Sequence, residues 1–149
     1  MTGEEILVPI DFSPSSVAAV QYSAMIARSL NASITLLHVY EPPTAMVGIV
    51  PGADATQDLE RERLTALTNL KQLSKSAASL DGIPLKLAVE VGYATRNILE
   101  HARVANTNLI IIGTHGRTGF ARLILGSVAQ GVLRFAKCPV ITVHLPEAI

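Results

Sequence analysis

Residues 109–127 read Leu109-Ile-Ile-Ile-Gly113-Thr-His-Gly116-Arg-Thr-Gly119-Phe-Ala-Arg-Leu-Ile-Leu-Gly126-Ser127, and this stretch decides the fold of the chain. Its four leading apolar residues indicate a buried strand. Four glycines follow within fourteen residues, and the last precedes a serine and an expected helix. Glycines let the backbone approach an anion, and the free N–H groups of a helix start attract negative charge. The stretch therefore predicts a phosphate-binding turn.

Apolar runs outside this stretch indicate four more strands, over residues 6–10, 33–40, 85–91 and 138–144. Helices are expected between the strands, over residues 14–30, 58–80, 95–105 and 128–136. Ser13 and Pro14 mark the start of the first helix, because a hydroxyl caps free N–H groups and proline fits the first helical position. Residues 41–57 form the one long irregular connection, a length that is usually functional or poorly ordered.

Two of these helices carry broad apolar faces. The first is expected to bury Val17, Val20, Ala24, Met25, Ile26, Ala27 and Leu30. The second places Leu64, Leu67, Leu70, Leu73 and Ala77 on one side. Both faces predict helices that pack on a sheet.

Strand and helix alternate along the whole chain, which predicts an α/β fold. The expected architecture is an open five-stranded parallel sheet with helices on both faces, formed as a single domain over residues 1–149. Ligands of such folds bind outside the carboxyl ends of the strands, where the strand order reverses. If the first and fourth strands are neighbours there, Asp11 and Gly113 meet across one crevice.

The composition fits a globular protein that binds a small anion. Apolar residues make up 49% of the chain and charged residues 16%. The net charge is zero, but residues 101–149 carry five Lys and Arg against one acid. A dense basic stripe with interleaved aromatic residues is absent from the sequence, which argues against DNA or RNA as a partner.

The sequence also predicts the compartment. Cys138 is the single cysteine, so no disulfide can form within the chain, as is typical of a reducing compartment. Glu4 and Glu5 stand where a signal peptide would be basic, and no apolar run approaches the roughly 20 residues of a membrane helix. We expect a cytoplasmic protein that is not inserted in a membrane.

The glycine-rich turn matches neither of two common phosphate-binding motifs. Its spacing is not that of the dinucleotide-binding Gly-x-Gly-x-x-Gly, and it lacks the lysine of the P-loop. Ser127 and Asp11 each have a plain structural alternative, as helix-start residues. Arg117 lies between two glycines and can reach an anion, although most surface arginines are simply solvated.

Evidence for catalysis or a protein-bound metal is weak in the sequence. His115 lies in the turn, but no acid, nucleophile or second ligand accompanies it. His38, His101 and His144 share no metal-ligand spacing, and Cys138 fits a small core residue. No catalytic residue and no metal ligand is therefore predicted.

Gly113-x-x-Gly116, nine residues and then Gly126-Ser127 resemble the ATP-binding signature of the universal stress protein family. The resemblance extends over nearly the whole chain. It includes the opening Ile6-Leu-Val-Pro-Ile-Asp-Phe-Ser13, the Leu36-Leu-His-Val39 run and the Cys138-Pro-Val140 ending. The family fold is Rossmann-like, similar to that of the adenine nucleotide alpha hydrolases, and agrees with the pattern above.

The resemblance implies a site for ATP. In family members that bind ATP, the strand-end aspartate and the second-strand valine, here Asp11 and Val39, surround the adenine. The glycines and Ser127 hold the ribose and phosphates, which can carry Mg²⁺ or Mn²⁺. A second branch of the family lacks the signature, whereas here it is complete. The candidate nucleotide-binding residues are Pro9, Ile10, Asp11, Val39, Ile112, Gly113, His115, Gly116, Arg117, Gly126, Ser127 and Val128.

Two departures from the family are small. Thr114-His115 stands where many members have other polar pairs, and Gly92-Tyr-Ala-Thr95 lacks a proline that often begins the third helix. Neither touches the expected phosphate contacts. The family also resembles electron-transfer flavoproteins, which leaves a flavin as an alternative ligand.

The last strand predicts a homodimer. It is apolar and expected at the sheet edge, and an exposed apolar edge is a liability unless it is paired. Pairing with a second copy through Val140–His144 would cover it, as the family resemblance also implies. Alternatively, residues 145–149 cover the edge.

Three functions remain open at this level. The first is an ATP-binding regulatory module of the stress response. The second is a slow ATPase in which His115 or a bound metal orients water. The third is a dimeric scaffold that binds no nucleotide. The stress, the protein partner and the choice between ATP, ADP and AMP are not determined by the sequence.

Overall fold

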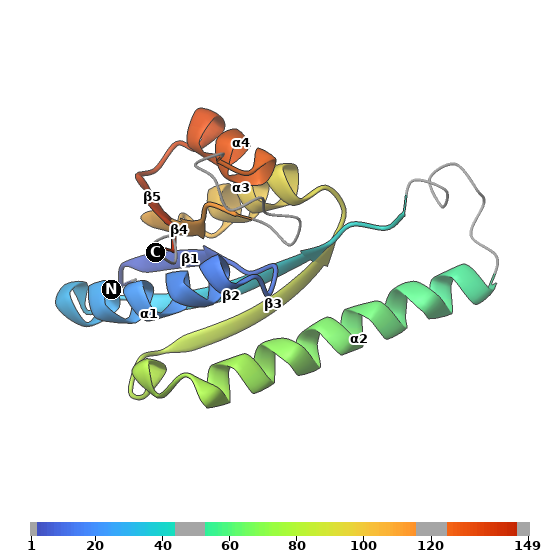
Figure 1. Cartoon of the computed structure of the whole chain (residues 1–149), viewed down its shortest axis with the longest axis horizontal. Coiled ribbons are helices and arrows are strands. Elements are labelled where there is room, and N and C mark those ends of the chain that lie inside the picture. Colours follow the sequence, from blue (N-terminus) through green and yellow to red (C-terminus); the bar gives the residue numbers. More distant parts are fainter. Residues whose placement is uncertain (1–2, 44–52, 116–124, 146–149) are drawn as a thin grey trace.

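Within the part of the chain that the structure describes, five strands alternate with four α-helices (Figure 1). The computed structural model describes residues 3–43, 53–115 and 125–145. In chain order the elements are β1 (Glu5–Pro9), α1 (Pro14–Leu30), β2 (Ser33–Tyr40), α2 (Ala53–Ser76), the short 3₁₀ helix η2 (Ala78–Leu80), β3 (Leu85–Val91), α3 (Ala94–Val104), β4 (Leu109–Gly113), α4 (Ser127–Phe135) and β5 (Val140–Val143).

The strands form one parallel sheet in the order β3-β2-β1-β4-β5. The predicted fold is therefore confirmed, with β1 and β4 as neighbours and the strand order reversing between them. β1 is paired with β2 at five positions but with β4 at only two, Ile6 with Leu109 and Leu7 with Ile110. The carboxyl ends of β1 and β4 thus extend past their short ladder. β5 lies at a sheet edge, as predicted.

Helices cover both faces of the sheet. α1 and α2 lie on one face and α3 and α4 on the other (Figure 1). Successive residues of a strand point to opposite faces, so Ile111 packs toward α1 and α2 while Ile110 and Ile112 pack toward α3 and α4. This explains why the strands read as continuous apolar runs.

The ends of α1 agree with the sequence prediction. The Ser13 hydroxyl accepts a hydrogen bond from the Ser16 N–H at 3.3 Å, and Pro14 is the first helical residue. Asn31 ends the helix in the left-handed conformation, with φ of 53°. Asparagine tolerates this conformation better than most residues, which explains why the helix stops there.

The predicted bounds of the second helix were wrong at both ends. α2 begins at Ala53, five residues before Asp58, because no glycine or proline interrupts residues 53–57. It ends at Ser76, and the expected last turn is the separate helix η2.

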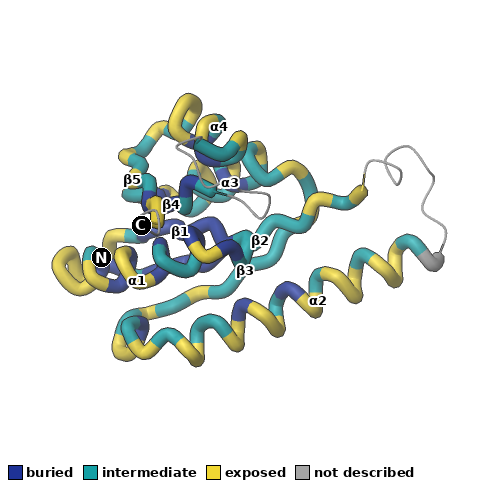
Figure 2. Tube along the Cα trace, viewed as in Figure 1, coloured by how far each residue is buried: buried dark blue, intermediate teal, exposed yellow. Residues whose placement is uncertain are grey.

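The predicted apolar faces were wrong at three residues. Leu64, Met25 and Leu30 are each half exposed. Ala66 and Leu70 are buried residues of α2 and mark its inner side. Leu64 lies about 200° around the helix from Ala66, and so on the outer side. Figure 2 shows the resulting alternation of buried and exposed residues along α2. Over the described ranges, no helix is both long and apolar enough to cross a membrane.

Candidate functional site

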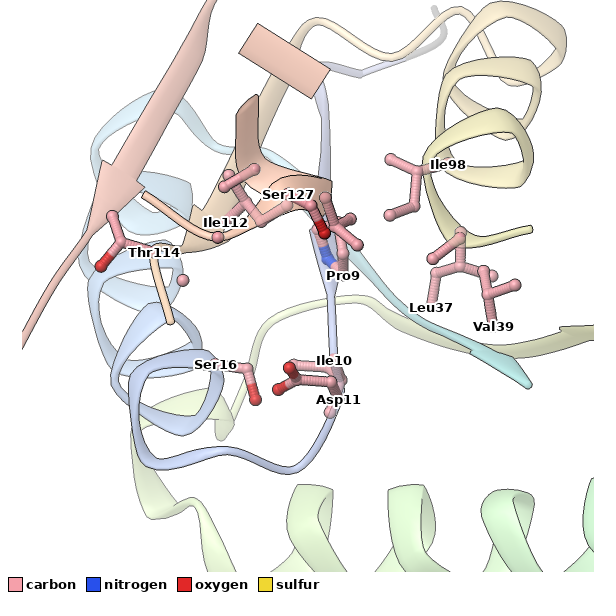
Figure 3. Close-up of a pocket in the computed structure, with 15 residues that line it drawn as sticks. Pro9, Ile10, Asp11, Ser16, Leu37, Val39, Ile98, Ile112, Thr114 and Ser127 are labelled. Atoms are coloured by element: carbon pink, nitrogen blue, oxygen red, sulfur yellow. The ribbon is translucent and has the colours of Figure 1, made fainter. Parts of the chain in front are cut away.

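A cavity of about 160 Å³ opens where the strand order reverses (Figure 3). The carboxyl ends of β1, β2 and β4 form its floor, and the amino-terminal turns of α1, α3 and α4 contribute to its walls. This is the position at which open parallel sheets bind ligands. Asp11 and Gly113 both line the cavity, so the predicted meeting of these two residues is confirmed.

Most of the predicted site residues that the structure describes line this cavity. They are Pro9, Ile10, Asp11, Val39, Ile112, Gly113, Gly126, Ser127 and Val128. Gly116 and Arg117, and with them Gly119 and Arg122, lie outside the described residues.

His115 is described but is not among the residues that line the cavity. Its Nδ1 lies 2.9 Å from the Thr114 hydroxyl. Its backbone is held by Ser15, whose hydroxyl donates to the His115 carbonyl at 2.7 Å and accepts from the His115 N–H at 3.3 Å. The His115 Nε2 atom is buried, and no described residue bonds to it. His115 thus joins the end of β4 to the start of α1.

Sequence reasoning missed six lining residues. They are Ser16, Leu37, Ala94, Ile98, Thr114 and Ala129. Leu37 could have been found, because it lies two residues before Val39 on a strand and therefore faces the same side. Ser16, Ala94 and Ile98 come from helix starts, whose approach to the cavity depends on packing.

The cavity has an apolar part and a polar part. Leu37 and Val39 of β2 and Ile98 of α3 lie together on one side of it (Figure 3). Asp11 and Ser16 lie beside each other at another side (Figure 3). An apolar slot that opens toward a few polar groups is the usual form of a small-molecule site.

Asp11 is held by the turn that begins α1. One carboxylate oxygen of Asp11 accepts a hydrogen bond from the Ser13 N–H at 2.9 Å. Ser16, behind it, is buried, and its hydroxyl donates to the Ser13 carbonyl at 2.9 Å. The acid therefore has a fixed place at the edge of the cavity.

The start of α4 has no side-chain cap. Gly126 is its N-cap residue and has no side chain to cap the helix. The first N–H groups of a helix have no partner within the helix, and the helix dipole makes this end positive. The Gly126 N–H donates to the Thr114 carbonyl at 2.7 Å, which fixes the start of α4 beside the end of β4. Ser127, the first helical residue, is exposed and lines the cavity.

Gly113 brings α1 unusually close to β4. A Cβ atom on Gly113 would lie 2.6 Å from the Ser15 Oγ, 2.7 Å from the Ser15 carbonyl carbon and 2.7 Å from the Ser16 N. Any side chain there would push the start of α1 away from the sheet. The glycine at this position is required by close packing.

Potential metal ligands do not gather in one place within the described residues. Throughout residues 3–43, 53–115 and 125–145, no three His, Cys, Asp or Glu side chains gather closely enough to hold a metal ion. Burial raises the pKa of the half-buried Cys138 thiol, so it stays protonated at neutral pH and is a poor nucleophile. Cys138 packs against the cluster under α3 and α4, in agreement with its predicted core role.

Comparison with known proteins identifies the family. The family model described as the universal stress protein family matches residues 4–144. Universal stress protein A homolog 1 of Coxiella burnetii is 34% identical over 97% of this chain and 98% of its own length. Universal stress protein UspA from Lactobacillus plantarum has a similar structure, with a TM-score of 0.80, 26% identity and coverage of 96% of this chain and 99% of its own.

Two more distant solved structures share the fold and hold nucleotides. One is a universal stress protein in complex with cAMP, with a TM-score of 0.68 and 24% identity over 98% of this chain and all of its own. The other, from Archaeoglobus fulgidus, is in complex with dAMP, with a TM-score of 0.61 and 18% identity over 96% of this chain and 99% of its own. The matched family model and the relative from Coxiella burnetii show that the chain belongs to the universal stress protein family.

Proposed function

We propose that this protein binds an adenine nucleotide, with ATP as the expected ligand, in the cavity between β1 and β4, and that it acts as a nucleotide-dependent regulatory module of the stress response. The observation that carries the proposal is the pairing of an apolar slot with an uncapped helix start in one cavity. These are the two surfaces that a base and a phosphate group require.

The apolar slot suits the base. Leu37, Val39 and Ile98 present aliphatic side chains, against which a flat ring can pack. Asp11, on the polar side, is an acceptor suited to an amino group such as that of adenine. The cAMP and dAMP complexes of the two distant structures support an adenine ligand.

The start of α4 suits the phosphates. The N–H groups that follow Gly126, together with the Ser127 hydroxyl, can bind phosphate oxygens, and the helix dipole favours their charge. Gly116 and Arg117 belong to the same proposed phosphate site. A divalent cation such as Mg²⁺ or Mn²⁺ would be held mainly through the phosphates, since the described acids do not cluster.

A binding role agrees better with this cavity than a catalytic one. Among the described lining residues, Asp11 is the one group with an acidic or basic side chain. His115, the candidate for orienting water in a slow ATPase, bonds to Thr114 and Ser15 instead of lining the cavity. Hydrolysis is therefore the second candidate function.

The direct test identifies the bound nucleotide. The protein is purified without added nucleotide and denatured, and any released molecule is identified by chromatography and mass. We expect ATP or ADP near one molecule per chain. If nothing is released, titration with ATP and Mg²⁺ follows, with GTP and FMN as controls. Failure of ATP, ADP and AMP to bind would refute the proposal, and preferential binding of FMN would favour the flavin alternative.

We also propose that two copies pair through β5. This strand is at the sheet edge, and Ile141 within it and Leu145 just after it are exposed, at 38% and 44%. Pairing would cover these side chains and satisfy the unpaired backbone groups of the edge.

An Ile141→Glu variant should therefore be monomeric, because two opposed carboxylates would meet in the paired strands. Light scattering during gel filtration measures the mass, and we expect a dimer for the wild type. Leu64→Glu is the matched control, since Leu64 is exposed on α2, away from β5, and should leave the dimer intact. A monomeric wild-type protein would contradict the proposed dimer.

A further inference from the structure

His38 lies on the opposite face of β2 from the cavity. Its neighbours Leu37 and Val39 line the cavity, so the alternation of the strand directs His38 toward α1 and α2. His38 is therefore placed behind the proposed site and does not line it. Its side chain nevertheless contacts two residues that flank Asp11.

The first contact is with the residue before Asp11. The His38 Nδ1 lies 2.6 Å from the Ile10 carbonyl oxygen. A carbonyl oxygen can only accept, so Nδ1 carries the proton. The Ile10 N–H donates to the Leu37 carbonyl at 2.8 Å. Both polar backbone groups of Ile10 are thus bound to neighbouring residues of β2.

The second contact is with the residue after Asp11. The rings of His38 and Phe12 have centroids 5.0 Å apart, with a 42° angle between their planes. Phe12 has a φ of +64°, in the left-handed region that bulky side chains rarely adopt. Such a conformation persists only where the surrounding structure enforces it. The tilted contact with the His38 ring and the Ser13 cap of α1 hold Phe12 from its two sides.

We propose that His38 is a positioning residue of the nucleotide site, acting through Asp11. It fixes the residues on both sides of Asp11, and so sets where the Asp11 carboxylate meets the ligand. The inference rests on the proposed function, because it concerns the affinity for the same nucleotide. His38 would thus influence binding although it does not line the cavity.

Two substitutions at His38 distinguish the loss of its hydrogen-bond donor from a general change in packing. His38→Leu keeps a side chain of similar size but removes the donor to Ile10, and we expect it to weaken ATP·Mg²⁺ binding roughly tenfold, the effect of one lost hydrogen bond. His38→Asn keeps an N–H donor near the place of Nδ1, and we expect affinity within about threefold of the wild type. Isothermal titration measures both affinities, and circular dichroism confirms that both variants are folded.

A double-mutant cycle with Asp11→Ala tests whether the effect passes through Asp11. Once the carboxylate is absent, its position no longer matters, so His38→Leu should weaken binding by less than about twofold further. Equal losses from His38→Leu with and without Asp11 would overturn the proposal, as would wild-type affinity in His38→Leu. An affinity of His38→Asn as low as that of His38→Leu would also overturn it. If the wild-type protein binds no adenine nucleotide, the proposed function itself fails, and this inference fails with it.

Discussion

A Gly126→Val variant should remain folded and lose affinity for ATP by roughly 100-fold or more. Gly126 has φ of −59° and ψ of 155°, a conformation that valine can also adopt, so the backbone need not change. The new side chain would enter the cavity at the start of α4, where we propose that a phosphate approaches the backbone. Losing two hydrogen bonds to a charged phosphate would cost about 3–6 kcal/mol, which corresponds to this loss of affinity.

Ser127→Ala provides the matched comparison for Gly126→Val. It removes one hydroxyl from the same helix start and keeps the N–H groups, so we expect a smaller loss of roughly tenfold, near the lower end of the cost of one hydrogen bond to a charged group. Titration calorimetry measures both variants, with thermal unfolding as the check on folding. Unchanged ATP affinity in a folded Gly126→Val protein would place the phosphates elsewhere.

Gly113→Ala should destabilise the protein by about 2–3 kcal/mol, because the added methyl group has no space. Its Cβ would lie 2.7 Å from two backbone atoms of Ser15 and Ser16, which cannot rotate away as the end of a side chain can. The start of α1 would have to move off the sheet. Since Ser16 and Gly113 both line the cavity, this displacement should also weaken nucleotide binding.

Gly3→Ala is the control for replacing a glycine with an alanine where there is space for the methyl group. A Cβ on Gly3 would have the Asn31 carbonyl oxygen at 3.8 Å as its nearest neighbour, which is ordinary contact. Urea unfolding of both variants gives the two free energies of unfolding, and we expect a change below about 0.5 kcal/mol for Gly3→Ala. A Gly113→Ala protein as stable as the wild type would show that the contact with α1 relaxes without cost.

The sequence predicted the fold well because local signals and packing agree. The apolar runs that became β2 and β3 have the predicted bounds, and Ser13, Pro14 and Asn31 delimit α1 through backbone rules that act within a few residues. The alternation of strands and helices predicted a parallel sheet, and the structure adds that β1 and β4 are neighbours, the condition on which the meeting of Asp11 and Gly113 depended. Asp11 and Gly113 accordingly line one cavity.

What the sequence did not predict depends on contacts between distant segments. Ile98 and Ser16 line the cavity because α3 and α1 approach it, and no local pattern distinguishes them from other core residues. His115 stands inside the glycine-rich stretch but is not among the lining residues, and its backbone bonds to Ser15, one hundred residues earlier in the chain, have no local signal. Leu64 is apolar and yet exposed, since Ala66 and Leu70 occupy the buried side of α2.

The short ladder between β1 and β4 has a consequence for how the molecule opens. Paired at only two positions, these strands join a three-stranded half of the sheet to a two-stranded half, and α1 spans the join. Amide hydrogens near this join should exchange with solvent through local opening more readily than those between β1 and β2. A nucleotide in the cavity would contact both halves at once and hold them together. Binding of a ligand would then make the two halves of the sheet open together instead of separately, without any change in fold.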